Sequence, residues 1–193
     1  KNLGIVYSPI HGTGHALVPE VLSKMGFTNI HTVEEQSTPD GNFPTVVYPN
    51  PEETEALTMA LEKAAEVNAE LVMATDPDAD RVGIAVKNLH NKFQLLNGNQ
   101  TASLLVYYML KRWQENKKLT GKQYIVKTIV TTDLIELIAK KFFVECYNTL
   151  TGFKYIAAII RKLEGEKEFI VGGEESYGYL ISDFVRDKDA IAS

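Results

Sequence analysis

The sequence has little of what marks secreted, membrane-spanning or nucleic-acid-binding proteins. Cys146 is the one cysteine among 193 residues, so the chain cannot form an intrachain disulfide, and a reducing compartment is expected. No apolar run approaches the roughly 18 residues of a membrane-spanning helix. The formal net charge is −5, and there is no basic stripe. We therefore expect a cytoplasmic protein that binds neither nucleic acid nor a membrane, although a local cluster of cations could still hold a phosphate ester.

Apolar runs alternate with helical patterns along the whole chain, which predicts a layered α/β architecture. In the first half we expect strands at residues 3–7, 30–33, 71–74 and 82–86, and helices at 17–25 and 51–67. Four prolines between residues 36 and 51 predict a long loop there. In the second half we expect helices at 101–113, 133–142 and 155–163, strands at 124–127, 144–147 and 169–171, and a helix that starts at 188–191. The boundary between the two units is predicted between residues 94 and 95.

Three aspartates, Asp76, Asp78 and Asp80, alternate along a short segment between two apolar strands. At ~4 Å and an effective dielectric constant of ~20, each pair of such carboxylates would cost about 4 kcal/mol in repulsion. A divalent cation removes this cost, and hard oxygen ligands favour magnesium, calcium or manganese. Arg81 follows directly and could hold a carboxylate or a phosphate.

The aspartate segment has two other interpretations. A solvated acidic turn is the simpler one. A calcium EF-hand would need glycine and glutamate where Arg81 and Lys87 stand, and helices where the flanking patterns predict strands, so this alternative fails.

A second segment, residues 172–178, reads Gly-Gly-Glu-Glu-Ser-Tyr-Gly after an apolar strand. Its glycines allow a sharp turn and a close approach of the backbone to a ligand. The side chains of Glu174 and Ser176 are natural partners of sugar hydroxyls, because a carboxylate can accept from two of them. A polar turn without a ligand is equally compatible with this segment taken alone.

Three shorter segments are weak signals individually. Arg186 and Lys188 could grip a phosphate, although an ion-paired surface segment is the more ordinary interpretation. Residues 11–14, His-Gly-Thr-Gly, could present backbone amides at a helix start, but Leu17 stands where a dinucleotide fingerprint has its third glycine. A structural turn is therefore favoured there. Thr151 and Gly152 lie in a polar turn between a strand and a helix.

Together these segments resemble the α-D-phosphohexomutases, the superfamily of phosphoglucomutases and phosphomannomutases, and among them the bacterial phosphoglucomutases most. Residues 75–81 resemble the metal-binding loop of that family, and residues 173–178 its sugar-specificity loop. Residues 186–189 resemble the stretch that follows the sugar loop, and Thr151-Gly152 a further loop that faces the substrate. Residues 7–14 are similar to the start of the family's second domain. The resemblance spans the chain in the family's order.

The resemblance implies two consecutive three-layer α/β domains with mixed sheets, domain II at residues 1–94 and domain III at 95–193. The family has four domains, of which the first carries a phosphoserine and the fourth a phosphate-binding loop. No serine of this sequence precedes a histidine, as the family's phosphoserine does. We therefore expect a fragment whose partners include domains I and IV of a parent chain, and which is inactive by itself.

The resemblance also implies roles for individual residues. Asp76, Asp78 and Asp80 would hold Mg²⁺, with Arg81 supporting the catalytic end of the site. The residues implied to bind the substrate are Thr151, Gly152, Glu174, Ser176, Arg186 and Lys188. The expected substrates are hexose phosphates: glucose 1-phosphate, glucose 6-phosphate and, as intermediate, glucose 1,6-bisphosphate.

Three alternatives remain at this point. The parent could prefer mannose or pentose phosphates, as a phosphomannomutase or phosphopentomutase. The chain could instead be a non-catalytic module that binds a sugar phosphate or a metal. It could also be an unrelated acidic α/β domain with a structural cation.

Overall fold

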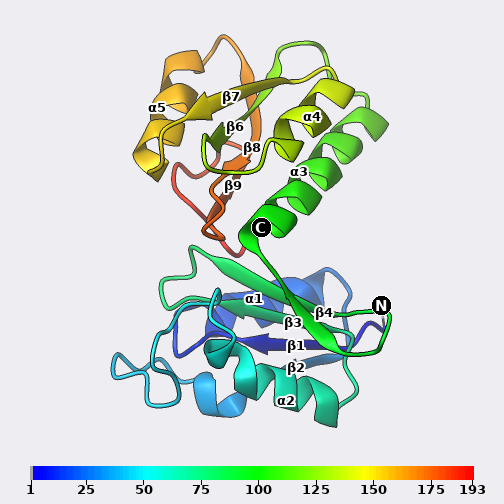
Figure 1. Cartoon of the computed structure of the whole chain (residues 1–193), viewed down its shortest axis with the longest axis vertical. Helices are drawn as coiled ribbons and strands as arrows, with labels where there is room; N and C mark the ends of the chain where they lie inside the picture. The colour runs from blue at the N-terminus through cyan, green and yellow to red at the C-terminus, as the bar shows by residue number, and fades with distance from the viewer. Residues whose placement is uncertain (1) are drawn as a thin grey trace. The chain divides into compact units, whose positions relative to one another are not determined.

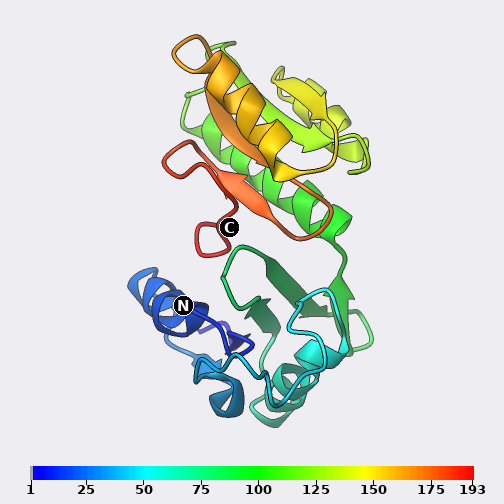
Figure 2. The same cartoon turned by 90° about the vertical axis from the view of Figure 1, so that its left-hand side faces the viewer.

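The computed structural model describes residues 2–193 and divides into two compact units, one ending at Leu96 and the other spanning Asn97–Ser193. Each unit is an α/β sandwich built around one mixed sheet (Figures 1 and 2). The predicted class, two consecutive α/β domains with mixed sheets, is confirmed. Within the described residues, no helix combines the length and the apolar composition needed to cross a bilayer.

Unit 1 contains a five-stranded sheet in the order β2-β1-β3-β4-β5. Its strands are β1 (Ile5–Ser8), β2 (Ile30–Thr32), β3 (Leu71–Thr75), β4 (Val82–Lys87) and β5 (Phe93–Leu96). The first three are parallel, and β4 and β5 continue the sheet antiparallel. The helices of this unit are α1 (Gly14–Lys24) and α2 (Thr58–Glu66). Two short 3₁₀ helices, η1 (Glu34–Gln36) and η2 (Glu55–Leu57), lie between them in the chain.

The order of the parallel strands puts the two helices of unit 1 on opposite faces of the sheet. The chain steps from β1 to β2 in one direction and from β2 to β3 in the other, and right-handed crossovers then cover both faces. Figure 1 shows α2 in front of the sheet and α1 behind it. The α2 side is closely packed because Ala60 and Ala64 are fully buried against Val6 and Val72.

Unit 2 repeats this plan with the order β7-β6-β8-β9. Its strands are β6 (Gln123–Thr128), β7 (Glu145–Thr149), β8 (Glu168–Gly173) and the antiparallel β9 (Tyr179–Ile181), and its helices are α3 (Gly98–Glu115), α4 (Leu134–Lys141) and α5 (Phe153–Leu163). Figures 1 and 2 show α5 on one face of the sheet, with α3 and α4 on the other. Tyr124, Ile156 and Phe169 form part of the core between α5 and the sheet.

Some local predictions need correction. The helix predicted from residue 51 begins as a 3₁₀ turn at Glu55 and becomes α2 only at Thr58, because Pro51 packs against the backbone of β4 at Gly83. The strands β5 and β9 were not predicted. Residues 190–193 form a turn in place of the predicted helix start, although Asp189 accepts backbone N–H groups two and three residues ahead, as an N-cap does.

The division between the units falls two residues after the predicted boundary. Leu95 and Leu96 belong to β5, where they pair with Ala85 and Ile84 of β4. Asn97 then caps α3 through a capping box with Gln100, so the same short segment ends one unit and begins the next.

Candidate functional site

The aspartate segment of unit 1 is a tight turn at the carboxyl end of β3. Asp76 follows the last residue of β3, and Ala79 closes the turn with a backbone hydrogen bond of 3.0 Å to the Asp76 carbonyl, at a φ of 56°. The Asp76 side chain holds the other half of the turn, because its Oδ1 accepts the backbone N–H groups of Asp80 and Arg81 at 3.0 and 2.9 Å. One carboxylate therefore determines the path of the whole segment.

The turn brings the three aspartates together. Each can offer one carboxylate oxygen such that all three oxygens lie within 4.8 Å of one another. Asp76 is buried, Asp80 half-buried and Asp78 exposed. The pKa of Asp76 is raised to about 7, mainly by burial; the Arg81 backbone N–H lowers it, and the charges of Asp80 and Asp78 contribute to the rise.

This donor set fits magnesium. All three donors are carboxylate oxygens, the ligand type that Mg²⁺ prefers, and a cation would offset both the burial of Asp76 and the repulsion from its neighbours. The exposed side of the turn, at Asp78, leaves room for the additional oxygen ligands that an octahedral ion requires.

Arg81 lies between the acidic groups of this turn and a neighbouring loop. Its Nε is 3.8 Å from Asp76 Oδ2 and 3.7 Å from Asp80 Oδ1, while Nη1 is 3.6 Å from Glu52 Oε1. These distances are long for ion pairs, and the side chain is 37% exposed. Arg81 is thus placed to meet a further anion beside the aspartates.

A hollow of about 400 Å³ adjoins the aspartate turn, and no sequence pattern indicated it. Asp76 and Arg81 form one wall, and the loop before η2 forms the other. The lining residues of that loop are Tyr48, Pro49, Asn50 and Glu53. The loop is anchored where Pro51 meets Gly83, since a Cβ on Gly83 would lie 2.6 Å from the Pro51 carbonyl oxygen.

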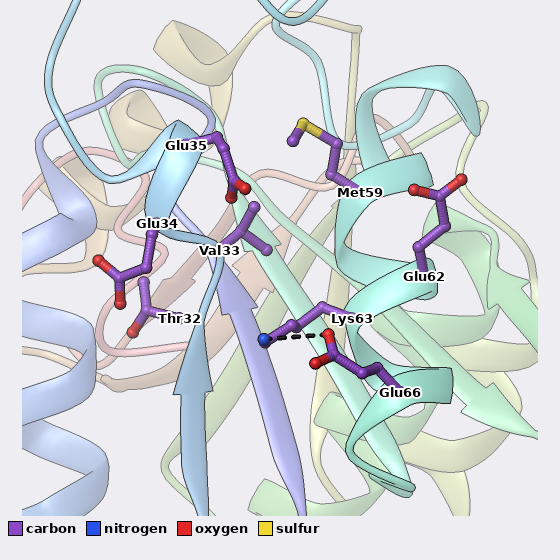
Figure 3. Close-up of a pocket in the computed structure, with 8 residues that line it drawn as sticks. All are labelled: Thr32, Val33, Glu34, Glu35, Met59, Glu62, Lys63 and Glu66. Atoms are coloured by element: carbon purple, nitrogen blue, oxygen red, sulfur yellow. Dashed lines mark hydrogen bonds and ion pairs between the residues drawn. The ribbon is translucent and has the colours of Figure 1, made fainter.

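A second hollow of unit 1 lies between η1 and α2 and has a volume of about 250 Å³. Figure 3 shows its glutamates around Lys63, which pairs with Glu66 at 3.1 Å. Its lining residues, none of which was predicted to belong to a site, are Thr32, Val33, Glu34, Glu35, Met59, Glu62, Lys63 and Glu66.

In unit 2 the predicted sugar loop and the predicted Thr151–Gly152 turn lie side by side at the carboxyl ends of β8 and β7. Glu174 is buried, and its Oε1 accepts the backbone N–H of Gly152 at 2.7 Å. Gly152 has a φ of 119°, a conformation that side chains other than hydrogen rarely allow. The contact between Glu174 and Gly152 therefore depends on glycine at this position. Thr151 is exposed and Ser176 half-buried on the same edge.

The two predicted cations of unit 2 are placed differently. The alkyl chain of Lys188 packs on Gly178, the last residue of the sugar loop, and its ammonium lies 5.3 Å from the centre of the Phe153 ring, next to Gly152. The guanidinium of Arg186 instead pairs with Glu164, beyond the far end of α5. Since an α-helix rises by 1.5 Å per residue, Glu164 lies about 16 Å along the helix axis from Phe153, at the start of α5.

Sequence reasoning missed a buried polar cluster beside the sugar loop. Thr131 Oγ donates to Glu175 Oε2 at 2.9 Å, and the hydroxyls of Thr128 and Thr131 are 2.7 Å apart. The ammonium of Lys127 is buried in the same place and donates to the Thr131 carbonyl at 2.9 Å. A lysine inside an apolar strand, with Thr-x-x-Thr directly after it, was the available sequence signal.

Comparison with known proteins decides which family this arrangement belongs to. Residues 1–91 match the sequence model of phosphoglucomutase/phosphomannomutase alpha/beta/alpha domain II, and residues 97–193 match that of domain III. The chain belongs to the phosphoglucomutase/phosphomannomutase family. The predicted resemblance to the phosphohexomutases is thereby confirmed, and the alternative of an unrelated acidic α/β domain is excluded.

Individual relatives agree with this assignment. The chain is 41% identical over 191 residues to a phosphoglucomutase of Staphylococcus aureus, covering 99% of this chain and 34% of that protein. It is similar in fold to a phosphoglucomutase/phosphomannomutase family protein from Burkholderia thailandensis, with a TM-score of 0.77 and 22% identity over 99% of this chain and 38% of the other. An N-acetylphosphoglucosamine mutase of Aspergillus fumigatus is more distant, with a TM-score of 0.62 and 17% identity over 94% of this chain and 34% of that one. The chain thus spans about a third of the length of its curated relatives.

The sugar loop should be sensitive to the start of α3. A Cβ on Gly98 would lie 1.6 Å from the Glu175 carbonyl oxygen, and because the Cβ position is set by the backbone and the oxygen belongs to it, no side-chain rotation relieves the contact. We expect Gly98→Ala to lower the free energy of unfolding in urea by about 1–3 kcal/mol. Gly41→Ala is the matched control, because nothing lies within 4 Å of its Cβ position. Equal midpoints for the two variants would show that α3 and the sugar loop are not in this contact.

Proposed function

We propose that this chain is the part of a phosphoglucomutase that binds the metal and recognises the sugar. The complete enzyme would interconvert glucose 1-phosphate and glucose 6-phosphate through a phosphoserine and a bisphosphorylated sugar. The observation that carries the proposal is the aspartate turn, in which three carboxylate oxygens lie within 4.8 Å and one of the carboxyls is buried. The identity of 41% to a bacterial phosphoglucomutase favours glucose phosphates over the mannose and pentose phosphates of related mutases.

Phosphoryl transfer asks a protein mainly for positioning and for charge stabilisation. Asp76, Asp78 and Asp80 would hold Mg²⁺, which supplies positive charge next to a phosphoryl group in transfer. Asp76 Oδ1 is already engaged by two backbone N–H groups, so its role is to orient the site as well as to bind. Arg81, held near Asp76, Asp80 and Glu52, would steady the anionic group on the exposed side of the turn.

Recognition of the sugar is assigned to the loops at the carboxyl ends of β7 and β8. Glu174 would accept hydrogen bonds from sugar hydroxyls, since a carboxylate has about four lone-pair sites and the Gly152 N–H takes one of them. Ser176 and Thr151 would add hydroxyl partners. The hydrogen bond to Gly152 already fixes the Glu174 side chain. Binding a sugar there therefore costs less conformational entropy than it would with a mobile side chain.

Lys188 is the better candidate for the phosphate of the substrate. Its side chain lies against Gly178 and Phe153, so Lys188 is close to both the sugar loop, residues 173–178, and the Thr151–Gly152 turn. Both cations are paired, Lys188 with Asp187 at 3.3 Å and Arg186 with Glu164, but the Arg186 pair lies beyond the far end of α5. We expect the complete parent to bind a bisphosphorylated sugar, because the A. fumigatus mutase has been solved in complex with glucose 1,6-bisphosphate.

A non-catalytic module that binds a sugar phosphate or a metal remains the second candidate, and activity separates it from the enzyme. We expect the 193-residue chain to have no measurable mutase activity in a coupled assay, because removal of an enzyme's nucleophile can cost about 10⁶ in rate. The positive control is a complete phosphoglucomutase under the same conditions. Magnesium-dependent turnover by the chain alone would contradict the assignment of the nucleophile to another part of the parent. A complete parent without activity towards glucose phosphates would favour the module.

Metal binding by the chain can be tested directly. We expect Mg²⁺ to raise the melting temperature of the wild-type chain in a concentration-dependent way, since binding to the folded state alone stabilises by about 2.7 kcal/mol at 100 times Kd. Asp78→Asn should abolish this shift, because it removes one of three charged ligands from the exposed side of the turn. Glu62→Gln removes the same charge elsewhere in unit 1 and should preserve the shift. Loss of the shift in both variants, or in neither, would argue against the aspartate site.

A further inference from the structure

The connection between β1 and α1, residues 9–13, is a strained loop; we refer to it as the buttress loop. Ile10 and His11 have φ values of 45° and 58°, in the left-handed region. A β-branched residue such as Ile10 rarely adopts this conformation, and Ile10 is fully buried. Backbone strain of this kind persists where surrounding contacts over-determine it, and it is concentrated near functional sites.

A network of buried polar groups holds the buttress loop in this conformation. His11 Nδ1 lies 3.1 Å from the Thr38 carbonyl, and because a carbonyl only accepts, Nδ1 carries the proton there. His11 Nε2 then accepts from the Thr45 hydroxyl at 2.8 Å, and Thr45 Oγ1 in turn accepts from the side-chain amide of Gln36 at 3.1 Å. Ser8 donates to Gln36 Oε1 at 2.5 Å. Four side chains from three segments therefore fix the loop from one side.

The other side of the buttress loop contacts the aspartate turn. The backbone N–H and the hydroxyl of Thr13 both donate to the Pro77 carbonyl, at 2.8 and 3.2 Å. Thr13 is the N-cap residue of α1, yet its hydroxyl makes no capping bond to that helix. Gly12 touches the same residue so closely that a Cβ would lie 2.4 Å from Pro77 Cα. Pro77 stands between Asp76 and Asp78, so these contacts fix the backbone that separates two of the three carboxylates.

We propose that Gly12 and Thr13 are positioning residues for the magnesium site, although neither would touch the ion. The strained turn at Ile10 and His11 brings them against Pro77, and the spacing between the Asp76 and Asp78 carboxylates depends on that contact. A metal site loses affinity when its ligands move by about 0.5 Å, because Mg²⁺ demands near-ideal geometry. This inference rests on the proposed function of the aspartate turn.

The test is the dissociation constant of Mn²⁺, used as a paramagnetic probe for the Mg²⁺ site and measured by electron paramagnetic resonance of the free ion. Gly12 has a backbone conformation open to alanine, so Gly12→Ala acts through the collision with Pro77. We expect it to weaken Mn²⁺ binding at least tenfold. Gly41→Ala, whose Cβ meets nothing within 4 Å, should bind as the wild type does. A role limited to packing would lower the melting temperature of Gly12→Ala and leave the dissociation constant unchanged, which would overturn the proposal.

Thr13→Val provides a second variant in case Gly12→Ala does not fold. It keeps the backbone N–H bond to Pro77 and loses the hydroxyl bond, so we expect a weakening of about threefold, the size of one neutral hydrogen bond. Wild-type affinity in Thr13→Val, together with wild-type affinity or no folding in Gly12→Ala, would overturn the positioning role. If the wild-type chain itself bound no Mn²⁺ saturably, the proposed metal function would fail first, and this result is distinct from equal binding by wild type and variants.

Discussion

The carboxylate of Asp76 is the group on which the arrangement of unit 1 depends. It is buried at the end of β3, and it accepts two backbone N–H groups of the residues that lead into β4. These bonds close the turn that gathers Asp78 and Asp80 around it. Burial is also the main reason why the pKa of Asp76 is raised to about 7, so the ionised form of this carboxyl is disfavoured unless a cation lies beside it. The conformation of the turn and the proposed metal binding thus both depend on this side chain.

The two units share the same strand topology. In each, a central parallel strand lies between two others, and an antiparallel strand follows the third, as in β2-β1-β3-β4 and β7-β6-β8-β9. Loops at the carboxyl ends of adjacent parallel strands then meet, which is where α/β sheets bind their ligands. In each unit, a glycine near the start of a helix lies so close to another backbone segment that a Cβ would not fit. Gly12, before α1, lies against Pro77, and Gly98, at the start of α3, lies against Glu175.

Much of the fold could be predicted from the sequence because its signals were local. Continuous apolar runs marked β1, β3, β4, β6 and β8; the aspartate segment lies directly after β3, and residues 174–176 lie directly after β8. The strands β5 and β9 were missed, since each has at most four residues and is recognised mainly by its antiparallel pairing with the strand directly before it. The predicted start of α2 was wrong because Pro51 packs on Gly83, a contact that no local sequence pattern indicates.

The same distinction applies to the candidate sites. The spacing of Asp76, Asp78 and Asp80 predicted their proximity, because residues in one tight turn cannot move far apart. The hydrogen bond of Glu174 to Gly152, the pairing of Arg186 with Glu164 and the Thr131–Glu175 contact all join residues at least 22 positions apart. Whether two such side chains meet is set by the sheet order, which a single sequence does not reveal. The hollow beside Arg81 has the same origin, since its second wall comes from residues 48–53.

A divalent ion bound at the aspartate turn would lie close to the buttress loop as well. Amide NMR spectra of the isotopically labelled chain, recorded during titration with substoichiometric Mn²⁺, locate the ion. We expect the signals of residues 76–81 to broaden first, together with those of Gly12 and Thr13. Broadening that began instead at Glu34, Glu35, Glu62 and Glu66, around the second hollow of unit 1, would contradict this expectation.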